Sequence, residues 1–228
     1  MMTTRAGALV LAVCLGFVLE GWADPRSVII EDWAMVPIGV RGVPPGWRGE
    51  TWGWHSMWDL TVVEDAGSKV LLLHSRDDRS TISKDLGNLV DLRATPILRW
   101  HWKVTALPAG GDARKKATTD QAAQLYVVWP RFPGILRSRI IGYAWDTTAP
   151  PGSIVRSQKT GTVTYVIVRS GTRDLGQWLT ERRDVWTDYM TVFGDVPDNP
   201  NAIALSIDSD DTHTSAESLI GTIRFRPR

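Results

Sequence analysis

Short runs of β-prone residues, separated by turns rich in glycine, proline and aspartate, fill most of this sequence. We predict strands at residues 57–63, 69–75, 97–105, 121–129, 138–145, 162–170, 201–208 and 219–225. Turn signals separate them at residues 65–67, 108–112, 150–152 and 197–200. Many short strands with such breaks indicate a mainly β fold. We expect one domain over residues 24–228, a jelly-roll-like β-sandwich, with a partly closed barrel as the alternative.

The strand predicted at residues 97–105 shows which side faces the core, because successive side chains of a strand point to opposite faces. Its apolar positions are Leu98, Trp100, Trp102 and Val104, and its polar positions are Arg99, His101, Lys103 and Thr105. Trp100 and Trp102 could form a sugar-stacking platform, but their apolar companions favour the core. The same alternation occurs in the strands at 121–129 and 201–208. It predicts that six residues point into the core: Leu125, Val127, Trp129, Ile203, Leu205 and Ile207.

One segment departs from the strand pattern. Between residues 181 and 193, apolar residues recur at three- and four-residue spacing, which is typical of a helix with one buried face. These residues are Val185, Trp186, Tyr189, Val192 and Phe193. Gly194 follows them and supplies a C-terminal stop. We predict a single helix near residues 181–193, packed against the sheets.

The first residues have the three parts of a secretory signal peptide. Arg5 supplies a positive charge, residues 6–19 form a short apolar core, and small residues precede a cleavage site before Asp24. We therefore expect residues 1–23 to be removed on export to the periplasm or the extracellular medium. One alternative is a permanent membrane anchor, for which the apolar core is shorter than the roughly 20 residues needed. Another is a lipoprotein modified on Cys14, which follows a bulky residue instead of a small one.

The composition excludes several classes of function. The only cysteine is Cys14, so a chain cleaved before Asp24 has no disulfide, thiolate metal site or cysteine nucleophile. The formal net charge is +1, which provides no broad field for binding nucleic acid. Beyond residue 23 no apolar run is long enough to span a bilayer. We expect no membrane-spanning segment in the mature chain.

Polar and aromatic residues on the predicted strands define a candidate binding face. If these strands share one sheet, its open side gathers rings that stack on sugars and charged groups that bond hydroxyls or carboxylates. The candidate ligand-binding residues are Arg99, His101, Lys103, Gln124, Tyr126, Tyr143, Trp145 and Ser206. The alternative is that these side chains only face water, as polar residues of a half-exposed sheet do. The core side of the strand at 138–145, which carries Tyr143 and Trp145, is ambiguous in the sequence.

An acidic stretch follows the strand predicted at 201–208. Asp208, Asp210 and Asp211 place three carboxylates within four residues. Because calcium takes six to eight oxygen ligands, such clusters can hold it, and we consider a structural Ca²⁺ on these three residues. Their spacing does not match an EF-hand loop. The alternatives are a polar turn whose aspartates accept hydrogen bonds from backbone amides, and a group of catalytic acids.

Catalysis has less support in the sequence. A glycoside hydrolase needs two carboxylates about 5–10 Å apart, and the spacing selects no pair among Asp120, Asp184, Asp188, Asp208 and Asp210. A lyase could use His101 or Lys103 as base and Tyr126 as acid. The sequence contains no nucleophile elbow, phosphate loop or zinc-protease motif. Its four histidines show no metal-ligand spacing, so zinc is not expected.

Several segments, taken in order, resemble one family. They are residues 31–33, 43–47, 98–104, 120–128, 142–145, 183–184, 188–189, 193–194 and 208–212. Together they resemble a family of exported bacterial proteins known as domain of unknown function 3047, over residues 31–225. The resemblance implies an exported single-domain protein and brings no known active site. Gln124 stands where the family usually has arginine, and Asp211 where it usually has asparagine, so any role of that arginine in binding a carboxylate is in doubt here.

Three functions fit these observations. The first is a binding module for a saccharide or a related polar polymer, favoured by the mixed aromatic and charged face. A looser similarity of the opening segment and of residues 221–225 to carbohydrate-binding jelly-roll modules concerns the fold alone. The second is a carbohydrate-active enzyme, hydrolase or lyase, on the same scaffold. The third is an envelope assembly or structural protein, whose surface tryptophans, drawn from the 12 in the sequence, would contact another protein.

Overall fold

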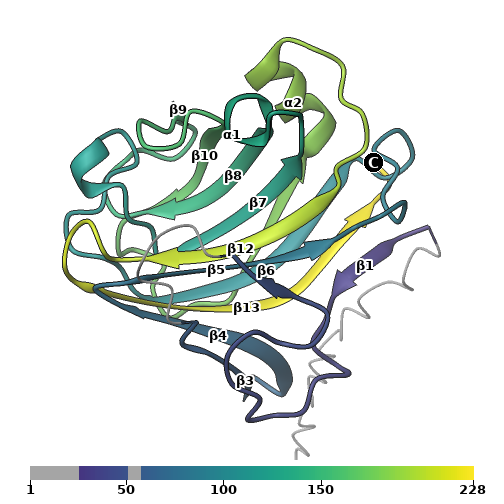
Figure 1. Cartoon of the computed structure of the whole chain (residues 1–228). Helices are drawn as coiled ribbons and strands as arrows, with labels where there is room; N and C mark the ends of the chain where they lie inside the picture. The colour runs from purple at the N-terminus through teal and green to yellow at the C-terminus, as the bar shows by residue number, and fades with distance from the viewer. Residues whose placement is uncertain (1–25, 51–57) are drawn as a thin grey trace, which may run out of the picture.

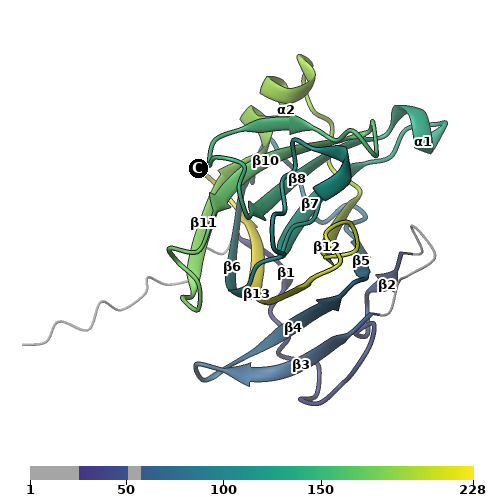
Figure 2. The same cartoon turned by 90° about the vertical axis from the view of Figure 1, so that its left-hand side faces the viewer.

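The computed structural model describes residues 26–50 and 58–228, so the predicted signal peptide lies outside the described residues. The described strands form two sheets that pack face to face (Figure 1, Figure 2). Sheet A contains β1 (Val28–Glu31), β3 (Leu60–Asp65), β4 (Ser68–Arg76), β6 (Ile97–Ala106), β11 (Leu179–Asp184) and β13 (Ser215–Arg226). Sheet B contains β2 (Arg48–Gly49), β5 (Arg79–Asp85), β7 (Ala123–Trp129), β8 (Arg139–Asp146), β9 (Ile154–Arg156), β10 (Val163–Ser170) and β12 (Ala202–Asp208).

The strand order shows how distant parts of the chain come together. Sheet A runs β11-β6-β13-β4-β3, and β1 pairs with the C-terminal half of β13. Sheet B runs β2-β5-β12-β7-β8-β10-β9. Neighbouring strands are antiparallel except β8 and β10, which run parallel. The long last strand β13, yellow in Figure 1, therefore lies in the middle of sheet A, between β6 and β4.

These sheets confirm the predicted mainly β sandwich with a helix near its C-terminal third. Each predicted strand overlaps an observed one, although residue 57 lies outside the described part. The sequence did not reveal β1, β2, β5, β9 or β11. Strand β5 carries one apolar side chain, Ile82, so no alternation marks it. Its backbone pairing with β12 and β2 holds it in sheet B.

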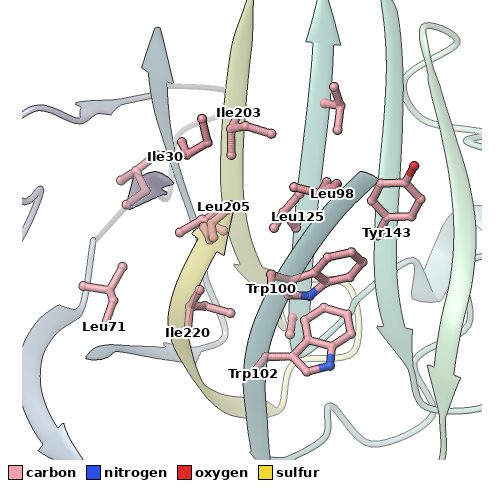
Figure 3. Packing of buried hydrophobic residues seen from close by; sticks show 14 of the residues in the cluster. Ile30, Leu71, Leu98, Trp100, Trp102, Leu125, Tyr143, Ile203, Leu205 and Ile220 are labelled. Atoms are coloured by element: carbon pink, nitrogen blue, oxygen red, sulfur yellow. The ribbon is translucent and has the colours of Figure 1, made fainter. Parts of the chain in front are cut away.

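The core lies between the two sheets and combines aliphatic side chains with several tryptophan and tyrosine rings (Figure 3). Trp100 and Trp102 are 0% exposed, which confirms their assignment to the core. The Trp100 ring stacks on Tyr143 of β8, with centroids 5.3 Å apart, and meets Trp102 edge-on at 5.3 Å. The other residues predicted to point inward are also buried: Leu98, Val104, Leu125, Val127, Trp129, Ile203, Leu205 and Ile207.

Two helices, α1 (Gly134–Arg137) and α2 (Val185–Phe193), and a 3-10 turn over Lys116–Thr118 accompany the sheets. The helix predicted from residue 181 begins later, because the preceding residues pair with β6 as strand β11. Asp184 accepts a hydrogen bond from the Thr187 amide at 3.1 Å and so caps the start of α2. Gly194 ends the helix in the left-handed conformation, as expected. No helix in the described part of the chain is long and apolar enough to cross a bilayer.

A partly buried ion pair ties α2 to both sheets. The Asp188 carboxylate accepts hydrogen bonds from Arg183 of β11, at 2.9 Å from Nε and 2.5 Å from Nη2. It also accepts from the Tyr143 hydroxyl of β8, at 2.7 Å. Burial and the neighbouring Asp188 charge raise the pKa of Tyr143 well above its usual value, so its hydroxyl remains a donor. Three of the segments that resemble the family thus contact one another through Tyr143, Arg183 and Asp188.

The two central tryptophans offer a matched test of this packing. The indole Nε1 of Trp102 donates to Glu181 at 3.2 Å, whereas that of Trp100 has no hydrogen-bond partner among the described residues. Replacing either ring by phenylalanine removes a similar volume. We therefore predict that Trp102→Phe lowers the free energy of unfolding by about 1–2 kcal/mol more than Trp100→Phe. Urea denaturation of both variants measures the difference, and equal losses would contradict the assigned role of the Glu181 bond.

Candidate functional site

The outer face of sheet B is hollowed into a groove with a volume of about 250 Å³. Its walls include residues of β5 and the segment that follows β9. The residues along its floor are Tyr126, Val128, Ile140, Val163, Tyr165 and Ala204. The charged residues of its lining are Arg48, Glu50, Arg79, Asp85, Lys159 and Asp208. The groove therefore combines an apolar and aromatic floor with charged side chains around it.

Two tyrosines and a glycine in direct register shape the floor. Gly142 of β8 lies opposite Tyr126 of β7 on one side and opposite Tyr165 of β10 on the other. A Cβ atom on Gly142 would lie 2.7 Å from the Tyr126 ring and 3.0 Å from the Tyr165 ring. The missing side chain lets both rings lean over β8, with their centroids 6.3 Å apart. Burial raises the pKa of Tyr126 and of Tyr165, so both keep their hydroxyl protons.

Hydrogen bonds between neighbouring strands fix the polar groups of the groove. Thr81 Oγ1 and Ser206 Oγ lie 2.8 Å apart across β5 and β12. Ser83 Oγ donates to Glu50 at 2.5 Å, and the Arg48 guanidinium donates to Asp85 at 2.7 Å. The groove therefore presents hydroxyls and charged groups that already form hydrogen bonds within the protein.

One end of the groove is acidic. Carboxylate oxygens of Asp120, Asp208 and Asp210 lie within 4.8 Å of one another, so this group could hold a metal ion. Burial, with the nearby charge of Asp120, raises the pKa of Asp208 well above its usual value. Arg79 of β5 donates to Asp210 at 2.8 Å and supplies one counter-charge. The acidic end is thus partly neutralised by the chain itself.

This acidic group contains Asp120 in place of Asp211, which the sequence analysis had included. The backbone N–H of Asp211 donates to Asp120 at 3.2 Å, and its carboxylate pairs with Lys159. Asp120 also accepts from the backbone N–H of Thr212 at 2.7 Å, so it caps the turn that follows β12. Because that turn directs Asp211 toward Lys159, Asp120 completes the group in its place. This contact could not be predicted from the sequence, because Asp120 precedes β7 and lies far along the chain from the turn after β12.

The predicted binding residues are divided between two faces. Tyr126 and Ser206 line the groove of sheet B, and buried Gln124 lies beside it, donating to Asp208 at 2.8 Å and accepting from the Tyr126 hydroxyl. The expectation of one shared sheet is wrong, because β6 pairs with β11 and β13 whereas β7 pairs with β12. The residues predicted on β6 therefore lie on the outer side of sheet A: Arg99, His101 and Lys103.

Tyr143 and Trp145 belong to the core instead of a binding face. They are 0% and 1% exposed, since their side of β8 packs against sheet A. The Tyr143 hydroxyl donates to Asp188, and Trp145 Nε1 donates to the Gly171 carbonyl at 3.1 Å. The prediction that these rings contact a ligand is wrong for this reason. Strand β8 is covered on both faces, which explains why its alternation was ambiguous.

The structure also separates the candidate catalytic residues. His101 and Lys103 lie on the opposite side of the sandwich from Tyr126, so the proposed lyase base and acid cannot meet on one substrate. Asp184 caps α2 and pairs with Arg228 at 2.9 Å. Asp188 is held by Arg183. The carboxylates that remain near the groove are Asp120, Asp208 and Asp210.

Several residues of the groove were missed in the sequence. Arg79, Thr81 and Ser83 come from β5, whose polar sequence carries no strand signal. Tyr165 comes from β10, which was predicted as a strand, and its alternation with Val166 could have indicated a second face. Gly142 could have been noticed as a small residue among bulky ones in β8.

The chain is similar to several solved structures at low sequence identity. The chain is similar to a family 11 carbohydrate-binding module of the cellulase Lic26A-Cel5E of Clostridium thermocellum, with 8% identity, a TM-score of 0.43, and coverage of 89% and 95% of the two chains. It is similar to the CBM22-1 xylan-binding domain of Paenibacillus barcinonensis Xyn10C, with 13% identity, a TM-score of 0.40, and coverage of 82% and 88%. It is also similar to the K2 cleaved adhesin domain of Lys-gingipain, with 9% identity, a TM-score of 0.44, and coverage of 89% of this chain and 98% of that domain.

No curated protein matches the chain. A family profile matches residues 45–224, which confirms the resemblance carried by the sequence motifs. The chain therefore belongs to the family described as Protein of unknown function (DUF3047).

Proposed function

We propose that this protein is a binding module for a saccharide or related polar polymer, and that the ligand lies in the groove on the outer face of sheet B. The observation that carries the proposal is the combination of two tyrosine rings with a charge-balanced polar lining in one concave site. Ligand sites generally have this form, a mostly apolar concavity with a few fixed polar groups.

The charge balance of the groove favours a neutral polar ligand. Its basic lining residues are Arg48, Arg79 and Lys159, and its acidic ones are Glu50, Asp85 and Asp208. Arg48 already pairs with Asp85 inside the groove. A highly charged ligand would have to displace such partners, whereas sugar hydroxyls can add hydrogen bonds to them. Saccharides meet both requirements, since they also present apolar ring faces to tyrosine.

Among the described residues every tryptophan is buried or half-buried. The third hypothesis, an envelope protein that binds a partner through surface tryptophans, therefore has less support from the described part of the chain, outside which Trp52 and Trp54 lie. The protein-binding function is less well supported than the groove.

A carbohydrate-active enzyme is the second candidate, because the partly buried acid Asp208 lies at the end of the groove. A general acid needs a raised pKa, and burial raises that of Asp208. However, Asp208 Oδ1 accepts from the Gln121 amide at 2.6 Å and from Gln124 at 2.8 Å, which favours a structural role. Products released from a bound polysaccharide by the wild type, and not by Asp208→Asn, would establish the enzyme.

We further propose that the protein acts in the periplasm or the extracellular medium after removal of residues 1–23. Mass spectrometry of the exported protein should then find an N-terminus at Asp24. Cys14→Ser is the control, because it leaves this processing unchanged but would abolish lipoprotein maturation. An uncleaved N-terminus on the cell-associated protein would contradict the proposal and support the membrane anchor.

Binding to the groove can be tested by affinity electrophoresis in gels that contain bacterial or plant polysaccharides. We expect one polymer to retard the wild type, and Tyr126→Leu to weaken that binding about tenfold, or about 1.4 kcal/mol, since it removes a ring from the floor. Gly142→Ala should also weaken binding, although the new side chain does not contact the ligand, because its Cβ would displace the Tyr126 ring.

The matched control for these variants is Thr105→Ala, on the outer face of sheet A. It should bind like the wild type. Equal mobility of the wild type in every gel would contradict the proposal for the polymers tested. Retardation that survives both groove substitutions would place the ligand elsewhere.

We also propose that Asp120, Asp208 and Asp210 bind a structural calcium ion at the acidic end of the groove. A ligand that binds only the folded state raises stability according to its concentration and Kd, so Ca²⁺ should raise the melting temperature relative to chelator. Asp208→Asn should remove this response, and Asp211→Asn should keep it, because Asp211 lies outside the group. The same melting temperature in calcium and chelator would mean that Arg79 and the turn amides suffice.

A further inference from the structure

Three arginines stand in direct register across the outer face of sheet A. Arg182 of β11 lies opposite Arg99 of β6, and Arg99 lies opposite Arg224 of β13. Their strand neighbours Trp100 and Ile223 are fully buried, so the arginine side chains emerge on the outer side. Figure 2 shows β11, β6 and β13 side by side along this face. We call Arg182, Arg99 and Arg224 the arginine row.

The arginine row is electrostatically unfavourable without a counter-ion. Residues directly opposite one another in an antiparallel pair have Cβ atoms about 5 Å apart, and like charges there are destabilising. Within residues 26–50 and 58–228, none of the three has an ion-pair partner. The Nε of Arg224 is buried and has no hydrogen-bond partner among these residues. The Arg224 guanidinium is therefore not held through its Nε by any described acceptor.

Several other arginines of the described chain form ion pairs. Arg183, next to Arg182, forms a bidentate pair with Asp188. Arg169 donates to Glu181 at 2.7 Å, and Arg131 donates to Asp198 at 2.6 Å. The acidic residues of these three pairs are therefore already neutralised by other arginines.

A depression of about 590 Å³ adjoins the row on the same face. Arg224 lines it together with His101, Trp178 and Gly221. A Cβ atom on Gly221 would lie 3.3 Å from the Cβ of His101 and 3.5 Å from the Trp178 ring. The absence of that side chain keeps the floor open between the two rings. A ligand bound to the row therefore has room for a neutral portion beside His101 and Trp178.

The acidic residues of this depression are already engaged. Asp65 pairs with Lys103 and accepts from Trp178 Nε1 at 3.4 Å. Asp32 accepts from the Ala34 amide at 3.0 Å. Neither forms an ion pair with Arg224 in the described structure. The positive charge of the row is therefore not cancelled from within the depression.

We propose that the arginine row binds an oxyanion, a carboxylate, sulfate or phosphate, and that the rest of the ligand lies in the depression beside His101 and Trp178. The guanidinium group offers paired donors that match the oxygens of such an anion. This site is separate from the groove of sheet B, on the other side of the sandwich, and does not depend on the function proposed for that groove. An acidic sugar and a free anion share this chemistry and differ in how much of the depression they fill.

The first test is a thermal shift with sodium phosphate, compared with sodium chloride at equal ionic strength. The wild type should melt at a higher temperature in phosphate. Arg99→Gln, which removes the central charge, should melt higher than the wild type in chloride and should show no phosphate response. Arg173→Gln removes one charge from an exposed turn after β10 and is the control, with a wild-type response.

Calorimetric titration then distinguishes the source of the anion. An oligogalacturonate that binds at least tenfold more tightly than phosphate, while a neutral galactose oligomer of equal length does not bind, identifies an acidic saccharide. Phosphate binding alone identifies a free anion. Arg224→Lys keeps the charge but loses the paired donors, so it should weaken the affinity for either ligand about tenfold. This second variant keeps the test valid if Arg99→Gln does not fold.

The proposal fails if neither phosphate nor oligogalacturonate stabilises or binds the wild type. It also fails if Arg99→Gln and Arg224→Lys respond to both probes as Arg173→Gln does. These outcomes leave the groove of sheet B untouched, because its residues are not altered in any of these variants.

Discussion

The packing of alternate side chains between the two sheets is the constraint on which the rest of this structure depends. Since neighbouring side chains of a strand point in opposite directions, burying Trp100 and Trp102 in the core commits Arg99 and His101 to the outer side of sheet A. Burying Leu125 and Leu205 commits Tyr126 and its neighbours to the outer side of sheet B in the same way. The core therefore determines two chemically different faces, one charge-balanced and concave, the other rich in arginine.

The connections beyond the strands then refine the groove. Asp120 precedes β7 and accepts hydrogen bonds from the turn after β12, which joins two segments far apart in the sequence. This contact holds Asp210 near Arg79 and Asp208 near Gln124, so the acidic end of the groove is a fixed part of the fold. An arginine at position 124, as the family resemblance implies is usual, would place a second positive charge against Asp208.

The sequence was most informative where periodicity was strong. Alternation in residues 97–105, 121–129 and 201–208 identified the core side of each strand, and capping at Gly194 identified the end of α2. It could not show that β6 and β7 belong to different sheets, because alternation describes one strand and not its partners. It also could not reveal β5, whose side chains line the groove while its backbone is held by pairing. Tyr143 and Trp145 were misassigned because β8 is covered on both faces and lacks a polar side.

A ligand bound in the groove of sheet B would cover the strands that line it. Hydrogen exchange of the backbone amides, measured with and without the polysaccharide that retards the protein, tests it most directly. We expect slower exchange in β5, β12 and the segment that follows β9, which line the groove, with no change in β6 and β11. Protection confined to β6, β11 and β13, with the groove strands unchanged, would contradict the claim and place the polysaccharide on sheet A.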